Sequence, residues 1–473
     1  MNYTALRDIQ ADLQTGKITL VKLTEYYLHR IEATRDLNIY TEVYAEAALR
    51  QAAEADAAFA ADPASVGRLH GAVISLKDVL CHAGHRVTGG SKILTGFESL
   101  FSATAVQRCL DEGAIVIGRV NCDEFAMGSA NENPHYGPTL NPTDPTRVPG
   151  GSSGGSAAAV RADTCLVSLG TDTGGSVRQP AAFCGVYGLK PTYGRISRYG
   201  LLAYASSFDQ LGFLTHSVTD AALFLEITAG VDEFDATCSS LPTERYLPTA
   251  EQPTKAKIAY FDSVVNHPSI DPEIRAAFLR TVEEYRTAGH TVEIQNFAYL
   301  DYIIPAYYVL TTAEASSNLS RYDGVRYGYR SPDASTTEEV YLKSRTEGFG
   351  TEVKRRIMLG TFVLSAGYYD AYYTKAQQVR RLIQQRTFEI LEEYDFILLP
   401  VAPGPAWKTG EKSNDPTEAY LADIFTVQAN MAGVPAMAFP VGTTEGGLPI
   451  GLQLTGRRFG EKALLKFVND RHG

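Results

Sequence analysis

The stretch that decides the fold runs from residue 257 to residue 294. It opens with the apolar run KIAYF (257–261) and closes with TVEI (291–294), and both runs are typical of strands. Between them, the dipeptide DP (271–272) is typical of a helix cap and first turn, and apolar residues recur at helical spacing until Gly289. A strand, a helix and a strand in this order predict two parallel strands joined by a right-handed crossover, so we expect an α/β protein.

Short apolar runs extend this alternation toward both ends of the chain. Residues 72–76 and 114–117 are strand-like before the central stretch, and residues 396–399 and 435–441 are strand-like after it. The sequence shows neither an internal repeat nor a long linker. We therefore expect one large α/β domain rather than several small ones.

Two segments outside this alternation are expected to be helical. Residues 1–62 should form a helical layer of the same domain whose α/β body is residues 63–473, because Thr19 precedes a helical apolar pattern and the run 42–61 is alanine-rich. The second segment is rich in tyrosine, in pairs four residues apart, so we expect packing along one helix face and no chemical role. Its tyrosines are Tyr368, Tyr369, Tyr372 and Tyr373.

Composition limits the possible functions. The chain has 473 residues, of which 43 are basic and 54 acidic, so its formal net charge is −11. Binding of nucleic-acid phosphates requires clustered Lys and Arg, and the excess of acidic residues does not favour such clusters. The six cysteines contain no CxxC pair and the nine histidines form no HExxH motif, so we expect neither a disulfide framework nor a metal site. Because no apolar run approaches the roughly 18 residues of a membrane span and no signal peptide is evident, we expect a cytoplasmic protein.

Two glycine- and serine-rich stretches, VPGGSSGGS (148–156) and GTDTGGS (170–176), are the strongest candidates for a functional site. Backbone N–H groups of such loops are available for binding when a helix follows. A nucleotide-binding module is one interpretation, with Asp172 as the acidic partner of a ribose. The glycines fall as GGxxGG rather than GxGxxG, however, and the sequence contains no GxxxxGK[ST] loop, so this signal is weak.

A serine nucleophile is the second interpretation of these loops. Overlapping GxSxG matches would make Ser152 or Ser153 the nucleophile of an α/β-hydrolase, but no histidine is singled out as its base. A third interpretation replaces the histidine with Lys77, which follows the apolar run 72–76. Burial near apolar surface shifts a lysine toward its neutral form, and a neutral lysine is a competent general base.

Several ordered motifs together resemble the amidase signature family. They are GAVISLKD (71–78), GGSSGGS (150–156) and TDTGGSVRQP (171–180). Four further segments are similar to the branch of that family whose members hydrolyse glutamine for a tRNA-dependent amidotransferase: DEFAMGS (123–129), GLKPTYGR (188–195), EVKRRIMLG (352–360) and AGYYDAYY (366–373). The resemblance extends over nearly the whole chain. It implies the family's fold, one large mixed β-sheet covered by helices on both faces.

The resemblance assigns catalytic roles within these motifs. It implies that Ser176 is the nucleophile, Ser152 the bridging serine and Lys77 the base, so that a proton passes from Ser176 through Ser152 to Lys77. It also implies a cis peptide bond between Gly151 and Ser152. An oxyanion hole is implied from backbone N–H groups, those of Thr173, Gly174, Gly175 and Ser176.

Glutamine is the substrate that the resemblance implies, and its α-carboxylate and α-amino groups need charged partners. The family's pattern places Arg356 on the carboxylate and Asp423 on the amino group, with Tyr307 and Ser129 beside them. Arg355 directly precedes Arg356, which leaves the register of the binding arginine open.

Partners are implied as well. The ammonia would pass to a partner protein, the B subunit, which holds the tRNA and uses ATP and magnesium to amidate Glu-tRNA(Gln), and a heterotrimer would be completed by a small C subunit. This chain has no ATP motif and is expected to hold no cofactor itself. Two alternatives stay open, a stand-alone amidase of the same family acting on small amides and a nucleotide-binding module. The chain departs from the family's pattern at Arg68 and Ala72, where prolines are expected, and at residues 130–131, where a serine–threonine pair is more usual.

Overall fold

In the residues that the structure describes, a single mixed sheet of 11 strands forms the centre of the protein, in the order β1-β3-β2-β4-β6-β5-β10-β11-β9-β7-β8. The computed structural model describes residue 1 and residues 3–247, 255–411 and 422–473. Neighbouring strands are parallel in the pairs β2–β3, β2–β4, β7–β8 and β7–β9 and antiparallel in the other pairs. The strands are β1 (Tyr40–Val43), β2 (Val73–Lys77), β3 (Ile115–Val120), β4 (Val167–Thr171), β5 (Tyr187–Lys190), β6 (Leu211–Thr215), β7 (Lys257–Phe261), β8 (Thr291–Gln295), β9 (Phe396–Pro400), β10 (Ala436–Thr443) and β11 (Pro449–Gly456).

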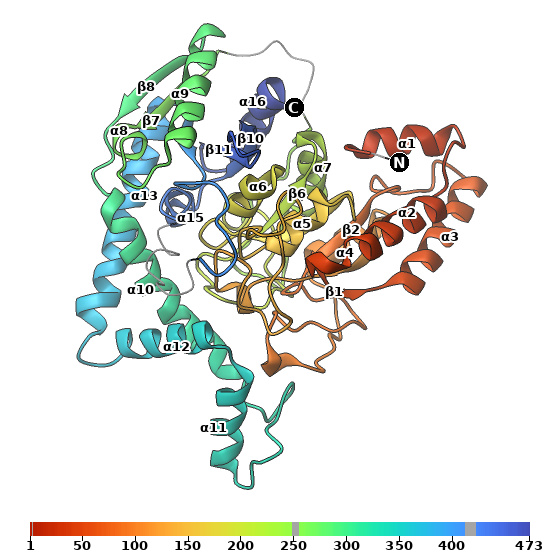
Figure 1. Cartoon of the computed structure of the whole chain (residues 1–473), viewed down its shortest axis with the longest axis horizontal. Coiled ribbons are helices and arrows are strands. Elements are labelled where there is room, and N and C mark those ends of the chain that lie inside the picture. Colours follow the sequence, from red (N-terminus) through yellow and green to blue (C-terminus); the bar gives the residue numbers. More distant parts are fainter. Residues whose placement is uncertain (2, 248–254, 412–421) are drawn as a thin grey trace.

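Helices pack against this sheet along its length, α3 on β3, α5 on β4, α6 on β5, α9 on β8 and α16 on β10. Figure 1 shows α1, α2 and α3 grouped at one end of the molecule and β7, β8 and α9 at the opposite end. The α-helices are α1 (Leu6–Gln14), α2 (Leu20–Ala33), α3 (Ala45–Ala61), α4 (Thr104–Asp111), α5 (Gly154–Arg161), α6 (Arg178–Cys184), α7 (Val218–Thr228), α8 (Asp262–Val265), α9 (Pro272–Thr287), α10 (Leu300–Asn318), α11 (Thr337–Gly348), α12 (Thr351–Val363), α13 (Lys375–Glu393), α15 (Val427–Ala432) and α16 (Glu461–His472). The short helices are η1 (Arg35–Leu37), η2 (Lys92–Leu94), η3 (Glu124–Ala126), η4 (Leu319–Arg321) and the π-helix η5 (Asp370–Thr374).

The central strand–helix–strand unit forms as predicted. Strands β7 and β8 pair in parallel, with Lys257 opposite Thr291. The side chain of Asp271 accepts a hydrogen bond from the backbone of Glu273 and caps α9, as a short carboxylate does at a helix start. Gly289 follows the helix with a φ of +87°, a left-handed conformation that favours glycine. The α/β class and the single mixed sheet are thereby confirmed.

The N-terminal segment is only partly as predicted. Thr19 caps α2 by accepting a hydrogen bond from the backbone of Lys22. The helix expected over 42–61, however, begins only at Ala45, because Glu42 and Val43 belong to β1. That strand pairs with β3, so hydrogen bonds to a strand about 75 residues away in the sequence override the local preference of the alanine-rich run.

The tyrosine-rich segment packs along one helix face, as predicted, but at the surface. Its pairs four residues apart do contact one another, with ring centroids 5.9 Å apart for Tyr368 and Tyr372 and 5.1 Å apart for Tyr369 and Tyr373. Three of these side chains are nevertheless exposed, because the π-helix η5 and the turn before it lie at the surface. The tyrosines therefore pack against one another along one face, as predicted, while Tyr368, Tyr369 and Tyr372 remain at the surface.

Parallel pairing of β2 with β4 positions the functional loops. Both strands are fully buried, and parallel strands end at the same edge of a sheet. Lys77 is the last residue of β2 and Thr171 the last residue of β4, so the loop after Thr171 begins beside Lys77. Within the described parts of the chain, no helix has both the length and the apolar composition that crossing a membrane requires.

Candidate active site

Lys77 is fully buried at the end of β2. Its Nζ is hydrogen-bonded to three hydroxyl oxygens, Ser152 Oγ at 2.7 Å, Ser153 Oγ at 2.9 Å and Thr171 Oγ1 at 2.8 Å. Burial lowers the pKa of Lys77 to about 8, and the neighbouring acidic groups only partly offset this effect. A neutral amine donates two hydrogen bonds and accepts one, so these three contacts suit a lysine that can take a proton from a serine.

The first glycine–serine loop delivers Ser152 to this lysine. The peptide bond between Gly151 and Ser152 is cis, which confirms that prediction. Ser152 and Ser153 are both fully buried, and α5 begins at the next residue, Gly154. Ser153 also connects the two loops, because its backbone N–H donates to the carbonyl oxygen of Ser176 over 3.0 Å.

Ser176 lies in the second loop and is 8% exposed, slightly more than the buried Ser152. The structure therefore brings the three predicted catalytic residues into one region. Among these three residues, Lys77 and Ser152 are hydrogen-bonded to each other. No hydrogen bond joins the hydroxyls of Ser152 and Ser176 in the described parts of the chain.

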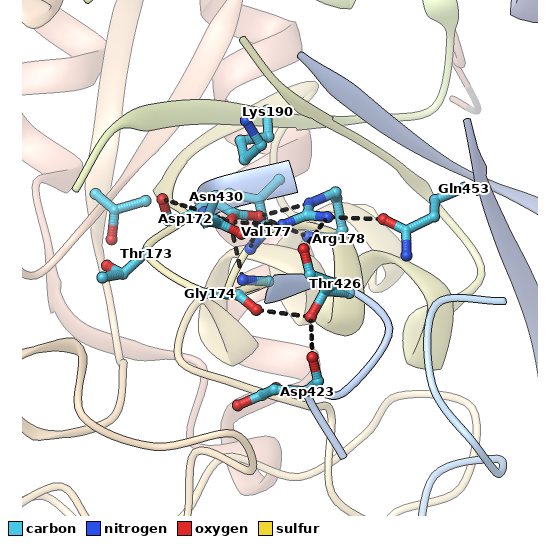
Figure 2. Close-up of polar contacts among 12 residues, drawn as sticks. Asp172, Thr173, Gly174, Val177, Arg178, Lys190, Asp423, Thr426, Asn430 and Gln453 are labelled. Carbon is cyan, nitrogen blue, oxygen red and sulfur yellow. Dashed lines mark hydrogen bonds and ion pairs between the residues drawn. The ribbon is translucent and has the colours of Figure 1, made fainter. Parts of the chain in front are cut away.

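A buried ion pair that the sequence analysis did not identify fixes the second loop (Figure 2). The Asp172 carboxylate pairs with the Arg178 guanidinium at 3.0 Å and accepts hydrogen bonds from the backbone of Gly175 and Val177 and from the Asn430 side chain. Burial opposes ionisation of Asp172, but the charge and hydrogen bonds of Arg178 outweigh it and lower the pKa to about 2. The Asp and Arg of TDTGGSVR are the sequence signal for this pair.

This ion pair corrects two interpretations of the second loop. The carboxylate of Asp172 is used by donors of the chain itself, so it is not available to a ribose as a nucleotide-binding module requires. The N–H of Gly175 donates to Asp172 over 2.9 Å and is therefore not free to bind an oxyanion in this structure. Of the four predicted donors, Thr173, Gly174 and Ser176 have backbone N–H groups without an acceptor in the described parts of the chain.

Tyr307 and the pair Ser129–Asp423 lie beside this loop. A Cβ atom on Gly174 would be only 2.5 Å from the Tyr307 hydroxyl oxygen, so the ring of Tyr307 lies directly against the loop and residue 174 must be glycine. The hydroxyl of Ser129 donates to the Asp423 carboxylate over 2.6 Å, and both residues are buried. Burial raises the pKa of Asp423 to about 7, and the Ser129 hydrogen bond and the charge of Arg356 oppose this rise.

Arg356 faces the interior, which settles the register of α12. Its side chain is 4% exposed, whereas that of Arg355 is 43% exposed. The guanidinium of Arg356 donates to Glu352 over 2.8 Å and to the Tyr204 hydroxyl over 2.9 Å, and its central carbon is 5.3 Å from the centre of the Tyr308 ring. Arg356 is thus a buried cation that already has one carboxylate partner, Glu352, and aromatic neighbours on other sides.

The described parts of the chain contain no group of three or more His, Cys, Asp or Glu side chains placed to hold a metal ion. The residues predicted to act on the substrate offer hydroxyl, backbone amide, carboxylate and guanidinium groups rather than a set of metal ligands. The site therefore combines a buried amine, two serines in adjacent loops and charged groups of opposite sign.

Comparisons with known proteins place this geometry in context. The profile of a family described as Amidase matches residues 22–465. The chain is 50% identical over 467 residues to the A subunit of glutamyl-tRNA(Gln) amidotransferase from Chlorobium phaeobacteroides, covering 98% of each chain. It is 49% identical over 464 residues to the protein of the same name from Acidobacterium capsulatum, covering 98% of this chain and 97% of that protein.

Solved structures show the same similarity. The A subunit of glutamyl-tRNA(Gln) amidotransferase from Thermotoga maritima is 42% identical and has a TM-score of 0.74, over 86% of this chain and 85% of that one. The native peptide amidase of Stenotrophomonas maltophilia is 28% identical with a TM-score of 0.82, over 98% of this chain and 96% of that one. Similarity over nearly the whole length therefore includes the β-sheet and both glycine–serine loops.

Proposed function

This chain belongs to the amidase family, and from that premise we propose that it is the glutamine-hydrolysing subunit of a glutamyl-tRNA(Gln) amidotransferase. The curated relatives that carry this name are about half identical to it over nearly their whole length. The observation that carries the proposed chemistry is the 2.7 Å contact between the buried amine of Lys77 and the hydroxyl of Ser152. It supplies a base to a serine where the sequence offers no evident histidine.

The proposed reaction proceeds through an ester. Neutral Lys77 takes the proton of Ser152, Ser152 takes the proton of Ser176, and the Oγ of Ser176 attacks the amide carbon of the glutamine side chain. The oxyanion that forms is bound by the backbone N–H groups of Thr173, Gly174 and Ser176. The C–N bond then breaks, the proton returns through Ser152 to the leaving ammonia, and water hydrolyses the γ-glutamyl ester to glutamate and free Ser176.

We propose that charged groups at the site recognise the two ends of glutamine that do not react. Arg356 binds the α-carboxylate and Asp423 the α-ammonium group, with Ser129 and Tyr307 completing the contacts. Burial of both charges in a region of low dielectric makes each contact stronger than it would be at the surface. A primary amide without these two groups would lose both contacts, which favours glutamine over simple amides.

Replacing Arg356 by methionine is expected to raise the KM for glutamine by about 10- to 100-fold, because a hydrogen-bonded charge contact of about 1.5–3 kcal/mol is lost. The measurement is steady-state glutamine hydrolysis by the assembled enzyme. Arg355→Met is the matched control, since its exposed side chain is expected to leave KM within about twofold of wild type. A rise in KM for Arg355→Met, or an unchanged KM for Arg356→Met, would assign the carboxylate contact to another residue.

We further propose that the ammonia passes to the B subunit, which uses ATP and magnesium and holds most of the tRNA, and that the assembly is completed by a small C subunit. The net charge of −11 supports this division, because an acidic chain has little electrostatic attraction for tRNA phosphates. The cytoplasm is the proposed location, since charged tRNA and ATP meet there.

Co-expression with the B and C subunits tests this proposal. We expect the chain to co-purify with them and the complex to hydrolyse glutamine in a reaction that Glu-tRNA(Gln) and ATP stimulate, with little tRNA binding by the isolated chain at physiological salt. Hydrolysis of simple amides by a partner-free monomer would favour the stand-alone amidase. Tight binding of tRNA to the isolated chain would overturn the proposed division of labour.

A further inference from the structure

Thr426 connects the nucleophile loop to the proposed glutamine-binding region (Figure 2). It is buried at the start of α15, and its Oγ1 lies 2.6 Å from the carbonyl oxygen of Gly174 and 3.0 Å from the carbonyl oxygen of Asp423. A hydroxyl has one proton to donate. The Asp423 carbonyl already accepts the backbone N–H of Thr426 at 3.0 Å, so the hydroxyl proton belongs to the shorter contact with Gly174.

That contact holds one side of the peptide group between Gly174 and Gly175. The other side of the same planar group, the N–H of Gly175, donates to the Asp172 carboxylate over 2.9 Å. The peptide plane is therefore fixed at both ends, by Thr426 through the C=O and by Asp172 through the N–H. The amides that flank this plane belong to Gly174 and Ser176, which are two of the proposed oxyanion donors.

Close packing reinforces this arrangement. Gly175 has a φ of +133°, and a Cβ atom on it would be 2.3 Å from Thr426 Oγ1 and 2.7 Å from Thr426 Cβ. The backbone carbonyl of Thr426 accepts a hydrogen bond of 2.9 Å from Arg178, the partner of Asp172. Thr426 thus contacts the loop and the ion pair that supports it.

We propose that the Thr426 hydroxyl is a positioning group for glutamine hydrolysis, which holds the Gly174–Gly175 peptide so that the flanking amides face the developing oxyanion. This inference rests on the proposed glutaminase function. In the described residues Thr426 has no hydrogen bond to Ser176, so the proposed role is positioning rather than catalysis. The backbone N–H of Thr426, which donates to the Asp423 carbonyl over 3.0 Å, also joins the oxyanion loop to the residue proposed to bind the α-ammonium group.

Two matched pairs of residue types at position 426 isolate the hydroxyl. Thr and Val both carry a β-methyl, while Ser and Ala both lack it, so within each pair little but the hydroxyl differs. In the assembled enzyme, Thr426→Val and Thr426→Ala are expected to lower kcat for glutamine by about 10- to 100-fold with KM within about threefold. Thr426→Ser is expected to stay within about threefold of wild type. Thr228→Val, which removes a buried hydroxyl bonded to the Phe224 carbonyl in α7, is expected to change kcat less than about twofold.

A transition-state analogue provides a readout that general destabilisation would not move. The boronic acid 2-amino-4-boronobutanoate keeps both charged ends of glutamine and forms a tetrahedral adduct with a serine hydroxyl. Its inhibition constant is expected to rise in Thr426→Val by about the factor by which kcat/KM falls, because both report binding of the tetrahedral oxygen. Amidation supported by free ammonia measures correct assembly and is expected to stay at the wild-type level.

Several results would overturn the proposal. One is a kcat within about twofold of wild type in Thr426→Val and Thr426→Ala. Another is a Thr426→Ser variant as slow as Thr426→Ala. A third is a higher KM in the hydroxyl-free variants with unchanged kcat and unchanged affinity for the boronate. Failure of both hydroxyl-free variants to assemble would assign the hydroxyl to folding and overturn it as well. Absence of glutamine hydrolysis in the wild-type assembly would instead refute the proposed function itself.

Discussion

Ser176→Ala is expected to abolish glutamine-supported amidation by the assembled enzyme, with a loss of more than about a thousandfold, and to leave ammonia-supported amidation intact. Alanine removes the only oxygen that the proposed mechanism uses to form the γ-glutamyl ester, and the side chain is small enough for the loop to keep its backbone contacts. The measurement compares Gln-tRNA formation with glutamine and with ammonium chloride as nitrogen donors, under otherwise identical conditions.

Ser156→Ala is the matched control for this experiment. Ser156 belongs to the other glycine–serine loop and is also buried, but it lies in the first turn of α5 and is not part of the proposed proton path. Its activity with glutamine is expected to stay within about twofold of wild type. Equal loss with both nitrogen donors in Ser176→Ala would mean that the residue supports the assembly rather than the chemistry.

Lys77→Met is expected to lower glutamine hydrolysis by about a hundredfold to ten-thousandfold, the usual contribution of a general base. Methionine fills most of the volume of the lysine stem in the buried site and removes only the amine that contacts Ser152, Ser153 and Thr171. The measurement is single-turnover release of ammonia at saturating glutamine. A variant with retained activity would indicate a histidine base, as in an α/β-hydrolase triad.

The same lysine predicts a pH dependence. The base acts only when deprotonated, and burial lowers its pKa from 10.5 to about 8, so kcat should rise with pH through about 8 and then level off. At pH 7 about a tenth of the lysine is neutral. The rise with pH is measured from kcat at saturating glutamine. Burial raises the pKa of Asp423 to about 7, so its protonation in the same pH range would weaken glutamine binding, which saturation removes from the measurement.

Lys190→Met is the control for this pH profile. Lys190 is a second fully buried lysine, and burial lowers its pKa to about 7. Its Nζ donates to the backbone carbonyls of Pro191 and Val434, which have no proton to give. The rise of kcat through about pH 8 should therefore persist in Lys190→Met and disappear from the residual activity of Lys77→Met. Persistence of the step in Lys77→Met would assign it to another group.

Local patterns predicted the elements of the fold better than their arrangement. The unit β7–α9–β8 follows from apolar spacing, a cap and a glycine, all of which act between residues close in sequence. Strand β1 was missed because its hydrogen bonds are to β3, and the run that continues it is rich in a helix former. The surface position of Tyr368 and Tyr372 does not follow from their spacing, which gives the face of a helix but not what covers it.

The same division holds for the site. The motifs supplied Lys77, Ser152 and Ser176, and the structure brings them into one region through parallel strands and two adjacent loops. The spacing of the motifs gave no reason to choose Arg356 over its neighbour Arg355, whereas the packing of α12 buries Arg356 and leaves Arg355 exposed. The Gly175 amide is taken out of the predicted oxyanion donors because its N–H donates a hydrogen bond to the Asp172 carboxylate.

The sequence by itself determined the α/β class, the residue types at the reaction centre and the family resemblance, because all three depend on short segments with fixed local spacing. Only the tertiary structure decided which donors are free and what holds them. The contact between Thr426 and Gly174 joins residues 252 positions apart, and no local pattern connects them. Hydrogen-bond direction depends on such contacts, since a peptide plane is oriented by whatever group reaches it in space.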